Sequence, residues 1–350
     1  MNKKLITLTF LMIIGGLNSI LSQQSVASTQ YFFFDYLFNP SLSGMKQYNN
    51  LNLNYSRQWL GFESSPSQIC VGYDFTNNKN KNGFGVSFQN EDQAGSYKQN
   101  SLGFNYSKHI TLSENTKLSA GFGVIFKQMI GDYTNLILPD QSDPTFNMGR
   151  ESNGIIDGTF GINYTKNNFR VGISSLNINE SKLVTGNNSS NISQFNPFKR
   201  QFYLNSSYSI AVKNKVDFYS NALFKLLNKD FFFSSIVILA KIKETFLLGV
   251  GNRIYSTTAS NQNSVIYNNS TFSFFMGIEK KSLSVTFNYD ISNNILFPSS
   301  ELTLGYKFIE TPSRKGSSSL KNIKTRLRIF GKKGHWWDPF FNTKLNKKIK

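Results

Sequence analysis

Few side chains in this sequence could do acid–base or nucleophilic chemistry. The 350 residues include two histidines and one cysteine. His109 stands in Lys108-His109-Ile110, at the end of an expected strand, and His335 lies near the C-terminus. A serine hydrolase needs a base beside its nucleophile and a polar group that orients the base, and no such pattern surrounds His109. We therefore interpret His109 as a polar residue at a strand end and expect no enzymatic activity.

Metal and cofactor sites are also poorly supported. One cysteine and two distant histidines do not give the spacing of a zinc site. Asp140-Gln141-Ser142-Asp143 resembles part of a calcium loop, but the glycine and the twelfth-position glutamate are missing. Cys70 lies within Ile69-Cys70-Val71-Gly72-Tyr73, so we expect a small apolar strand residue rather than a reactive thiol. The sequence therefore predicts no catalytic residue, no metal and no cofactor.

The elements available to position any site are strands, because apolar residues recur with a period of two. Between residues 117 and 130, for example, one face carries Leu118, Ala120, Phe122, Val124 and Phe126. About fourteen antiparallel strands are expected, at 51–58, 67–75, 83–91, 98–109, 117–131, 154–165, 169–178, 200–212, 216–227, 230–242, 246–255, 271–279, 282–290 and 300–309. Lengths near ten residues suit tilted strands that cross a bilayer. The expected fold is an all-β transmembrane barrel of the outer membrane. The stretch Phe231 to Ile242 is apolar on both faces, so we expect it where the lumen is filled.

The connections between these strands indicate an orientation. Long connections are expected at about 132–153, 179–199 and 256–270, and short ones near 166–168, 213–215, 243–245 and 280–281. Outer-membrane barrels have short periplasmic turns and longer external loops. We therefore expect both termini in the periplasm. Tyr73, Phe75, Tyr106, Tyr133, Tyr164, Tyr255 and Tyr289 fit aromatic girdles at the membrane interfaces, although Tyr and Phe favour strands in any case.

Charge divides the chain into three parts. Lys3, Lys4 and the apolar run 5–14 predict a signal peptide at 1–22, cut near Ser22 and Gln23. Of the formal net charge of +18, residues 313–350 contribute +11, from twelve Lys or Arg and one acid. The barrel region, 23–312, is close to balanced, so nucleic-acid binding is not expected. We interpret 313–350 as a basic periplasmic tail. The low mean hydropathy of −0.31 excludes a helical membrane protein.

Two motifs resemble those of a known family. Residues 36–44, Tyr-Leu-Phe-Asn-Pro-Ser-Leu-Ser-Gly, resemble the YMFNP…NPAYAG opening of the PorP/SprF family of type IX secretion system membrane proteins from Bacteroidetes. Residues 57–66, Arg-Gln-Trp-Leu-Gly-Phe-Glu-Ser-Ser-Pro, resemble that family's RxQWVGFxGAP element. The resemblance covers about 30–309. It departs from the family at 41–43 and 64–65, and the basic tail is not a feature of every member. Asn39, Pro40 and Gly44 are residue types that favour turns, so we expect the chain to turn there.

The resemblance implies an outer-membrane component that assists secretion or surface attachment of a specific exported adhesin, with a role in gliding as one form of this. Expected partners are the adhesin's C-terminal sorting domain, periplasmic or outer-membrane secretion components, and lipid. Candidate partner-binding residues are Arg57, Gln58, Trp59, Phe62, Trp336 and Trp337. Either the first four form a loop in the barrel mouth, with Arg57 reaching a carboxylate, or Trp59 lies at the lipid interface. The tail is either a binding segment or a disordered extension. The alternative function is a passive or fatty-acid-type transporter.

Overall fold

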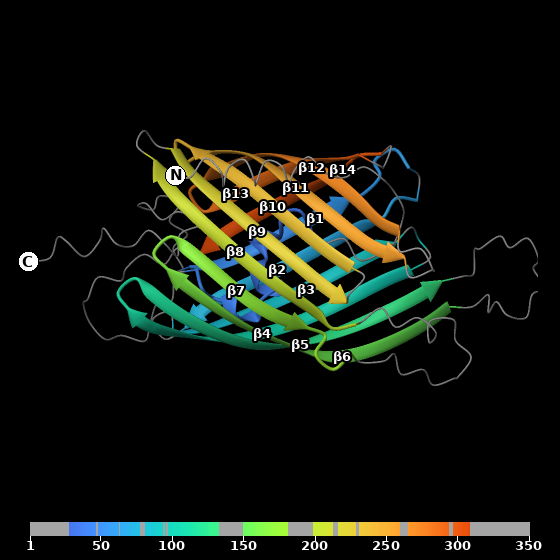
Figure 1. Ribbon diagram of the computed structural model, residues 1–350, viewed down its shortest axis with the longest axis horizontal. Coiled ribbons are helices and arrows are strands. Elements are labelled where there is room, and N and C mark those ends of the chain that lie inside the picture. The colour runs from blue at the N-terminus through green and yellow to red at the C-terminus, as the bar shows by residue number, and fades with distance from the viewer. Residues whose placement is uncertain are drawn as a thin grey trace, which may run out of the picture.

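The computed structural model describes residues 28–308, except for 47, 63, 78–80, 94, 96, 133–149, 181–198, 213–215, 229–230, 260–264 and 294–296. The expected signal peptide at 1–22 and basic tail at 313–350 lie outside these residues. The described residues form fourteen strands that close into one antiparallel barrel (Figure 1). Within the same residues, no helix is long and apolar enough to cross a membrane. The predicted fold class and strand number are confirmed.

Each strand pairs with its neighbours in sequence, and β1 pairs with β14 to close the ring, from Asn49↔Phe308 to Arg57↔Ser300. Closure leaves no sheet edge in the membrane, so backbone N–H and C=O groups find partners there. The strands are β1 (Asn49–Arg57), β2 (Ser67–Asn77), β3 (Asn82–Gln93), β4 (Tyr97–Ser113), β5 (Thr116–Asp132), β6 (Arg150–Lys166), β7 (Phe169–Leu176), β8 (Gln201–Val212), β9 (Val216–Asn228), β10 (Phe231–Ile242), β11 (Phe246–Ala259), β12 (Val265–Lys280), β13 (Leu283–Ser292) and β14 (Ser299–Phe308).

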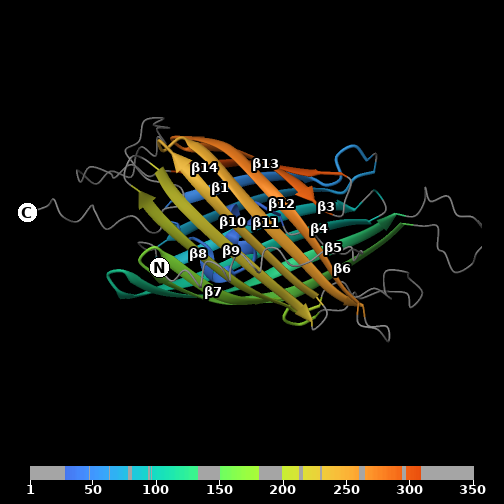
Figure 2. The same cartoon turned by 45° about the horizontal axis from the view of Figure 1, so that its top comes forward.

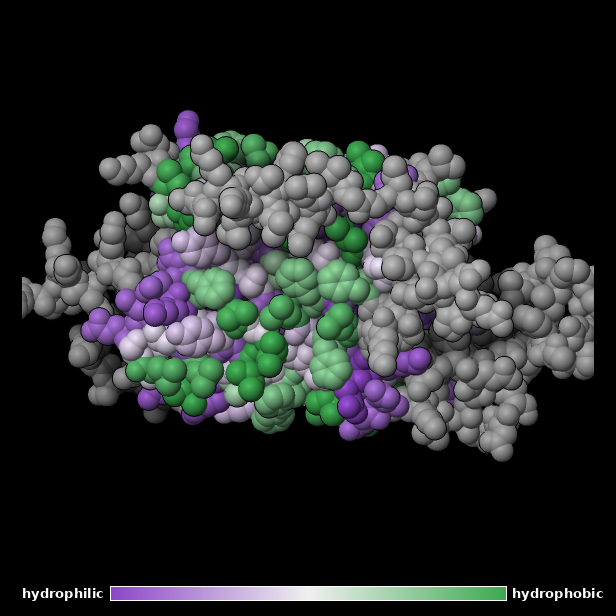
Figure 3. All heavy atoms as spheres, in the orientation of Figure 1, coloured by the Kyte–Doolittle hydropathy of each residue, from purple (hydrophilic) through white to green (hydrophobic). Residues whose placement is uncertain are grey.

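Alternation along the strands separates an apolar outer wall from a polar inner wall. On β1, Leu51, Leu53 and Tyr55 are exposed outward, whereas its asparagines at 50, 52 and 54 are buried. Figure 3 shows hydrophobic side chains gathered across the middle of the visible wall, with hydrophilic ones toward its ends. Tyr255 departs from the expected aromatic girdle. Its ring faces the lumen, 4.9 Å from that of Phe233. The prediction assumed that the inner face of every strand is polar. The inner face of β11 belongs to an apolar cluster instead, so an aromatic ring can lie there.

The two ends of the barrel carry different connections. We call the end with the connections after odd-numbered strands the loop end, and the other the turn end. At the turn end, β4 and β5 are joined by residues 114–115, β6 and β7 by 167–168, and β12 and β13 by 281–282. At the loop end, β5 and β6 are joined by 133–149 and β7 and β8 by 177–200. These connections agree with the long ones predicted at about 132–153 and 179–199. The long connection predicted at about 256–270 is wrong, because β11 continues to Ala259 and β12 begins at Val265, which leaves only residues 260–264 between them.

The lumen is occupied by the segment before β1, which we call the plug (residues 28–46). It contains three short 3-10 helices, η1 (Tyr31–Phe33), η2 (Asp35–Leu37) and η3 (Pro40–Leu42). The first blue segment in Figures 1 and 2 lies inside the ring of strands. The chain runs from near β13 and β14 toward the turn end, where it enters β1.

Candidate functional site

The local fold of the plug is set by residues that favour turns, at Asn39-Pro40 and Gly44. Asn39 is the N-cap of η3, and its Oδ1 accepts hydrogen bonds from the Ser41 amide at 3.1 Å and the Ser41 hydroxyl at 2.6 Å. Pro40 follows at the first helical position, where its missing N–H costs nothing. Gly44 then turns the chain with φ of 58°. The predicted turn at Asn39-Pro40 and Gly44 is confirmed, and it shapes a luminal segment.

One side of the plug is apolar and packs against strands β8–β12. Tyr31, Phe32, Phe33 and Phe34 are each at most 4% exposed. They form one cluster with wall residues Cys70, Tyr203, Tyr219, Leu223, Phe233, Val237, Leu239, Leu247 and Phe275. Phe32 lies 6.0 Å from Phe275, centroid to centroid. The expectation that Phe231 to Ile242 faces a filled lumen is confirmed.

The other side of the plug lies against wall positions without side chains. A Cβ added at any of these glycines would meet plug atoms at 2.6 Å or less, apart from Gly85 at 2.7 Å: Gly72, Gly83, Gly85, Gly121, Gly161 and Gly172. At Gly83 the obstructing atom is the backbone oxygen of Ser43, and at Gly121 it is the backbone of Pro40. We call these six the plug-facing glycines. The wall therefore leaves space for Tyr36 to Gly44 where strand residues would otherwise fill the lumen.

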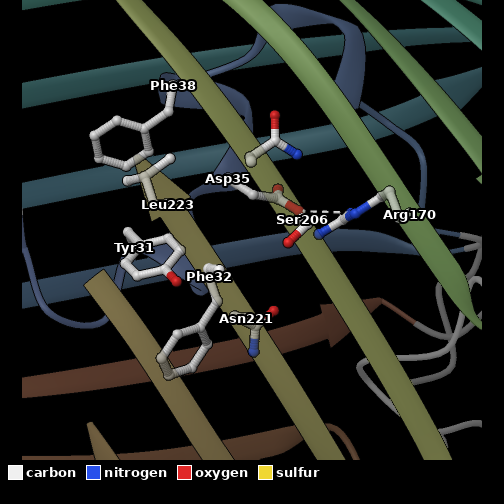
Figure 4. A pocket seen from close by; sticks show the side chains of 10 residues that line it. Tyr31, Phe32, Asp35, Phe38, Arg170, Ser206, Asn221 and Leu223 are labelled. Carbon is white, nitrogen blue, oxygen red and sulfur yellow. Dashed lines mark hydrogen bonds and ion pairs between the residues drawn. The ribbon is translucent and has the colours of Figure 1, made fainter. Parts of the chain in front are cut away.

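Polar contacts fasten the middle of the plug. Arg170 Nη1 of β7 lies 3.0 Å from Asp35 Oδ2, and both side chains are about nine-tenths buried. Asn39 Nδ2 donates to Asn205 Oδ1 at 2.9 Å. Beside the ion pair lies a cavity of about 10 Å³, enough for about one water molecule. Figure 4 shows Asp35 directed at Arg170, with the rings of Tyr31, Phe32 and Phe38 along the same space. This part of the interface between plug and wall has no room for a transported solute.

Near the turn end, Ser43 is held by a cluster of serine and histidine. Ser107 Oγ donates to the Ser43 carbonyl at 2.6 Å, and His109 Nε2 lies 3.0 Å from the same oxygen. Because a carbonyl can only accept, Nε2 carries the proton, and Nδ1 accepts from the Ser119 hydroxyl at 2.8 Å. The interpretation of His109 as a strand-end residue is therefore wrong. It lies inside β4, which continues to Ser113, and it is buried.

The first described residues of the plug are fastened to β13 and β14. Ser28 Oγ donates to Glu301 Oε2 at 2.7 Å, and the Thr29 amide donates to Glu301 Oε1 at 2.7 Å. Thr29 Oγ1 donates to Asp290 Oδ2 at 2.9 Å, and the same oxygen pairs with Arg253 Nη2 at 2.5 Å. At the opposite end, Lys241 and Lys307 both pair with Glu279.

Three of the predicted site residues, Gln58, Trp59 and Phe62, lie in a loop at the loop end, which we call the rim loop (residues 58–66). The fourth, Arg57, is the last residue of β1. The Gln58 amide donates to the Pro66 carbonyl at 2.9 Å, and the Leu60 amide donates to the Pro298 carbonyl at 2.7 Å. Trp59 takes φ of 51° and is half-buried, and its amide lies 3.4 Å from Ser299 Oγ. These contacts join the connection after β1 to the one after β13 across the β1–β14 seam.

Two large side chains are exposed here, those of Arg57 at the end of β1 and Phe62 in the rim loop. Phe62 is 48% exposed, and its ring lies 6.1 Å from that of Phe297, which is 39% exposed. Arg57 is exposed, and its Nε donates to Ser65 Oγ at 2.6 Å; the neighbouring acid at 63 lies outside the described residues. The rim loop and its neighbours Arg57 and Phe297 therefore present an exposed aromatic pair and a guanidinium close to the seam.

The remaining predicted site residues, Trp336 and Trp337, lie outside the described residues. In the described part of the chain, no three His, Cys, Asp or Glu side chains are grouped to hold a metal ion. The sequence analysis missed the plug as a site. The available signal was glycine at inward positions of several strands, as at Gly83 and Gly85 of β3 and Gly121 of β5.

Comparison with known proteins gives one family. Residues 20–306 match the sequence pattern of the family described as "Type IX secretion system membrane protein PorP/SprF". No curated protein matches the sequence. Among solved structures, the chain is similar to "CymD monoaromatic hydrocarbon channel", with a TM-score of 0.48 and 11% identity over 83% of this chain and 95% of that one.

Two further solved structures have comparable similarity. A Pseudomonas aeruginosa FadL homologue gives a TM-score of 0.46 and 11% identity over 77% of this chain and 93% of that one. The Acinetobacter baumannii outer membrane protein Omp33 gives a TM-score of 0.44 and 8% identity over 76% of this chain and 100% of that one. Likenesses this distant carry no argument about function.

Proposed function

The chain belongs to the PorP/SprF family of type IX secretion system membrane proteins, and from this premise we propose that it is a docking protein rather than a conduit. In this role it holds a specific exported adhesin at the outer membrane by that protein's C-terminal sorting region. The barrel gives a fixed position in the membrane, and the loop end gives the contact surface. The family membership and the barrel establish an outer-membrane component of the secretion system; the adhesin and the sorting region are the proposal.

The observation that carries the proposal is the filled lumen. The plug contacts both sides of the wall, through the aromatic cluster with β8–β12 and through the plug-facing glycines of β2, β3, β5, β6 and β7. Its polar groups are tied to wall residues from Asp35–Arg170 to Ser43–Ser107. Passage of a solute through this interior requires that these contacts break together. A protein that stays in this state acts through its surface.

The rim loop is the surface that we assign to the partner. Exposed aromatic and Arg side chains are the residue types that most often dominate protein–protein binding energy. Phe62 and Phe297 present such a pair, with Arg57 close by in sequence. Since the long connections lie at this end, we place it outside the cell, in contact with exported protein. The end of β14 at Phe308 then faces the periplasm, whereas the plug begins at Glu301, close to the loop end.

The proposal includes no catalytic step. Ser107 and His109 resemble a nucleophile and its base in type only, because the Ser107 hydroxyl donates to the Ser43 carbonyl and both residues are buried under the plug. We expect purified protein to hydrolyse neither phospholipids nor esters. Hydrolysis that disappears in Ser107→Ala would contradict this part of the proposal.

The tail is proposed to bind the periplasmic secretion or gliding machinery. Trp336 and Trp337 lie among its basic residues, and aromatic residues this dense favour binding over a purely solvated extension. Deleting 313–350 should leave the barrel inserted but reduce adhesin display or gliding. The measurement is surface labelling of exported proteins together with an outer-membrane fractionation. Unchanged secretion and gliding after the deletion would contradict a role for the tail in binding this machinery.

The experiment that tests the function is purification of the full chain from outer membranes followed by mass spectrometry. The docking role predicts co-purification with one large exported protein. The alternative, a passive or fatty-acid-type transporter, predicts solute flux into liposomes and no such partner. Flux without a partner would overturn the proposal in favour of the transporter.

A further inference from the structure

The start of the plug lies beside two buried carboxylates whose charges are unevenly balanced. Asp290 is 2% exposed and Glu301 is 5% exposed. Arg253 pairs with Asp290 at 2.5 Å, and among the described residues Glu301 forms no ion pair. Two carboxylates and one guanidinium leave an excess negative charge in a buried place. Burial of an uncompensated charge is costly, so a further cation is expected there.

Glu301 is contacted by the first three described residues of the plug, through the side chain of Ser28 and the backbone of Thr29 and Gln30. The Ser28 hydroxyl donates to Glu301 Oε2 at 2.7 Å, and the Thr29 and Gln30 amides donate to Glu301 at 2.7 and 3.2 Å. The Ser28 nitrogen is three covalent bonds from that hydroxyl. A positive charge on this nitrogen would therefore lie next to the carboxylate of Glu301, which forms no ion pair within the part of the chain that the structure describes.

The sequence just before Ser28 allows such a charge to form. Residues 25–27 are Ser-Val-Ala. Signal peptidases require small residues at the first and third positions before the scissile bond, and Ala27 and Ser25 fill these positions for a cut after Ala27. The polar stretch Ser22 to Gln24 separates them from the apolar run. This site lies downstream of the cut near Ser22 and Gln23 expected from the sequence.

We propose that signal-peptide removal occurs between Ala27 and Ser28, and that the new α-ammonium of Ser28 binds Glu301 and Asp290. A signal peptidase adds one water across the amide bond. The hydroxyl goes to the Ala27 carbonyl carbon, which leaves as a carboxylate, and the Ser28 nitrogen becomes an amine and takes up the released proton. Before this cut the same nitrogen is a neutral amide and cannot supply the charge.

The consequence is an order of events in assembly. While the leader is attached, the chain continues from Ser28 and the carboxylate pair lacks its second cation. After the cut, the ammonium completes the group formed by Arg253, Asp290 and Glu301, and the start of the plug becomes fixed to β13 and β14. This inference does not depend on the type IX secretion role, because it concerns only the plug and its wall.

The first test uses the unaltered protein purified from outer membranes. N-terminal sequencing and intact mass should give Ser28 as the first residue. A mature chain that begins at Gln23 or at any other residue overturns the proposal. No variant is needed for this measurement, so a folding defect cannot obscure it.

The second test is a double-mutant cycle read at Cys70. This residue is the single cysteine of the chain, is 4% exposed, and belongs to the same apolar cluster as the plug aromatics, so its rate of maleimide labelling reports plug displacement. Two glycines inserted between Ala27 and Ser28 keep the cleavage sequence but move the amine by about 7 Å. Insertion or Glu301→Gln alone should each raise the labelling rate by about a hundredfold or more, as expected for loss of a buried ion pair.

The two changes remove the same interaction, so combining them should raise the rate little further. The matched control is Glu279→Gln, a buried carboxylate at the turn end that pairs with Lys241 and Lys307. Its effect should multiply with that of the insertion, because the two sites are independent. If the effects of Glu301→Gln and the insertion multiply in the same way, the ammonium does not bind Glu301 and the proposal fails.

Discussion

At the scale of single residues, the plug depends on positions where the wall has no side chain. Gly161 and Gly158 lie on the same strand, β6, and differ in what a Cβ would meet. At Gly161 it would stand 2.1 Å from Asn39 Oδ1, whereas at Gly158 the nearest atom is 3.9 Å away. This pair separates the effect on the plug from the general effect of replacing a strand glycine.

We expect Gly161→Ala to destabilise the folded barrel by about 1–3 kcal/mol, as overpacking of a tight interior does. Gly158→Ala should change stability by less than about 0.5 kcal/mol. Urea unfolding in detergent or lipid, followed by tryptophan fluorescence, measures both. Equal effects at the two positions would mean that Gly161 is not required for the plug.

The Asp35–Arg170 pair makes a second prediction at this scale. Both side chains are about nine-tenths buried, so Arg170→Ala leaves an uncompensated carboxylate next to the aromatic cluster. The expected loss is about 3–5 kcal/mol. Adding Asp35→Asn to Arg170→Ala should recover part of it, since the stranded charge is then gone. A double variant no more stable than Arg170→Ala would contradict this role for the pair, and the same unfolding measurement decides it.

At the scale of elements, the strands were predictable and the plug was not. Period-two alternation gave all fourteen strands, because each has one face toward lipid and one toward the lumen. Boundaries were missed where polar residues extend a strand, as at the start of β6, predicted at 154 and observed at Arg150. Alternation between apolar and polar residues carries no signal in Arg150-Glu151-Ser152, yet backbone pairing with β5 continues there.

The plug could not be read from periodicity because its three helices have three residues each. Its contacts also join residues far apart in the chain, such as Asp35 with Arg170 and Asn39 with Asn205. The sequence supplied the turn at Asn39-Pro40 and the apolar stretch of β10, but not the fact that these two meet. The two family motifs thus form two different elements, the plug and the rim loop.

The rim loop makes a prediction at the scale of elements. Phe62→Ala should weaken co-purification of the exported partner about tenfold or more, as loss of a central aromatic contact does. Barrel insertion should not change, because Phe62 lies in the connection between β1 and β2 and its ring packs on that of Phe297. The control is Phe104→Ala, an outward aromatic on β4 that is 53% exposed. Partner recovery that is equal for Phe62→Ala and wild type would remove the rim loop from the proposed interface.

At the scale of the whole molecule, the barrel is a fixed frame around a folded internal segment. Polar inner residues are usual in a barrel with a water-filled lumen, but here many of them hydrogen-bond to the plug. The long connections lie at the loop end. This end therefore offers more surface beyond the membrane than a barrel that serves only as an anchor would need. This arrangement suits a component that presents a surface within a larger secretion machine.

The measurement that tests this account most directly is the conductance of the purified full-length protein in planar lipid bilayers. The plugged barrel should give no steady open-channel current at moderate voltage. An N-terminally altered variant that labels readily at Cys70 should give discrete openings and so serves as the positive control. A stable, voltage-independent pore in the unaltered protein would contradict the central claim that its lumen is closed and that it works through its surface.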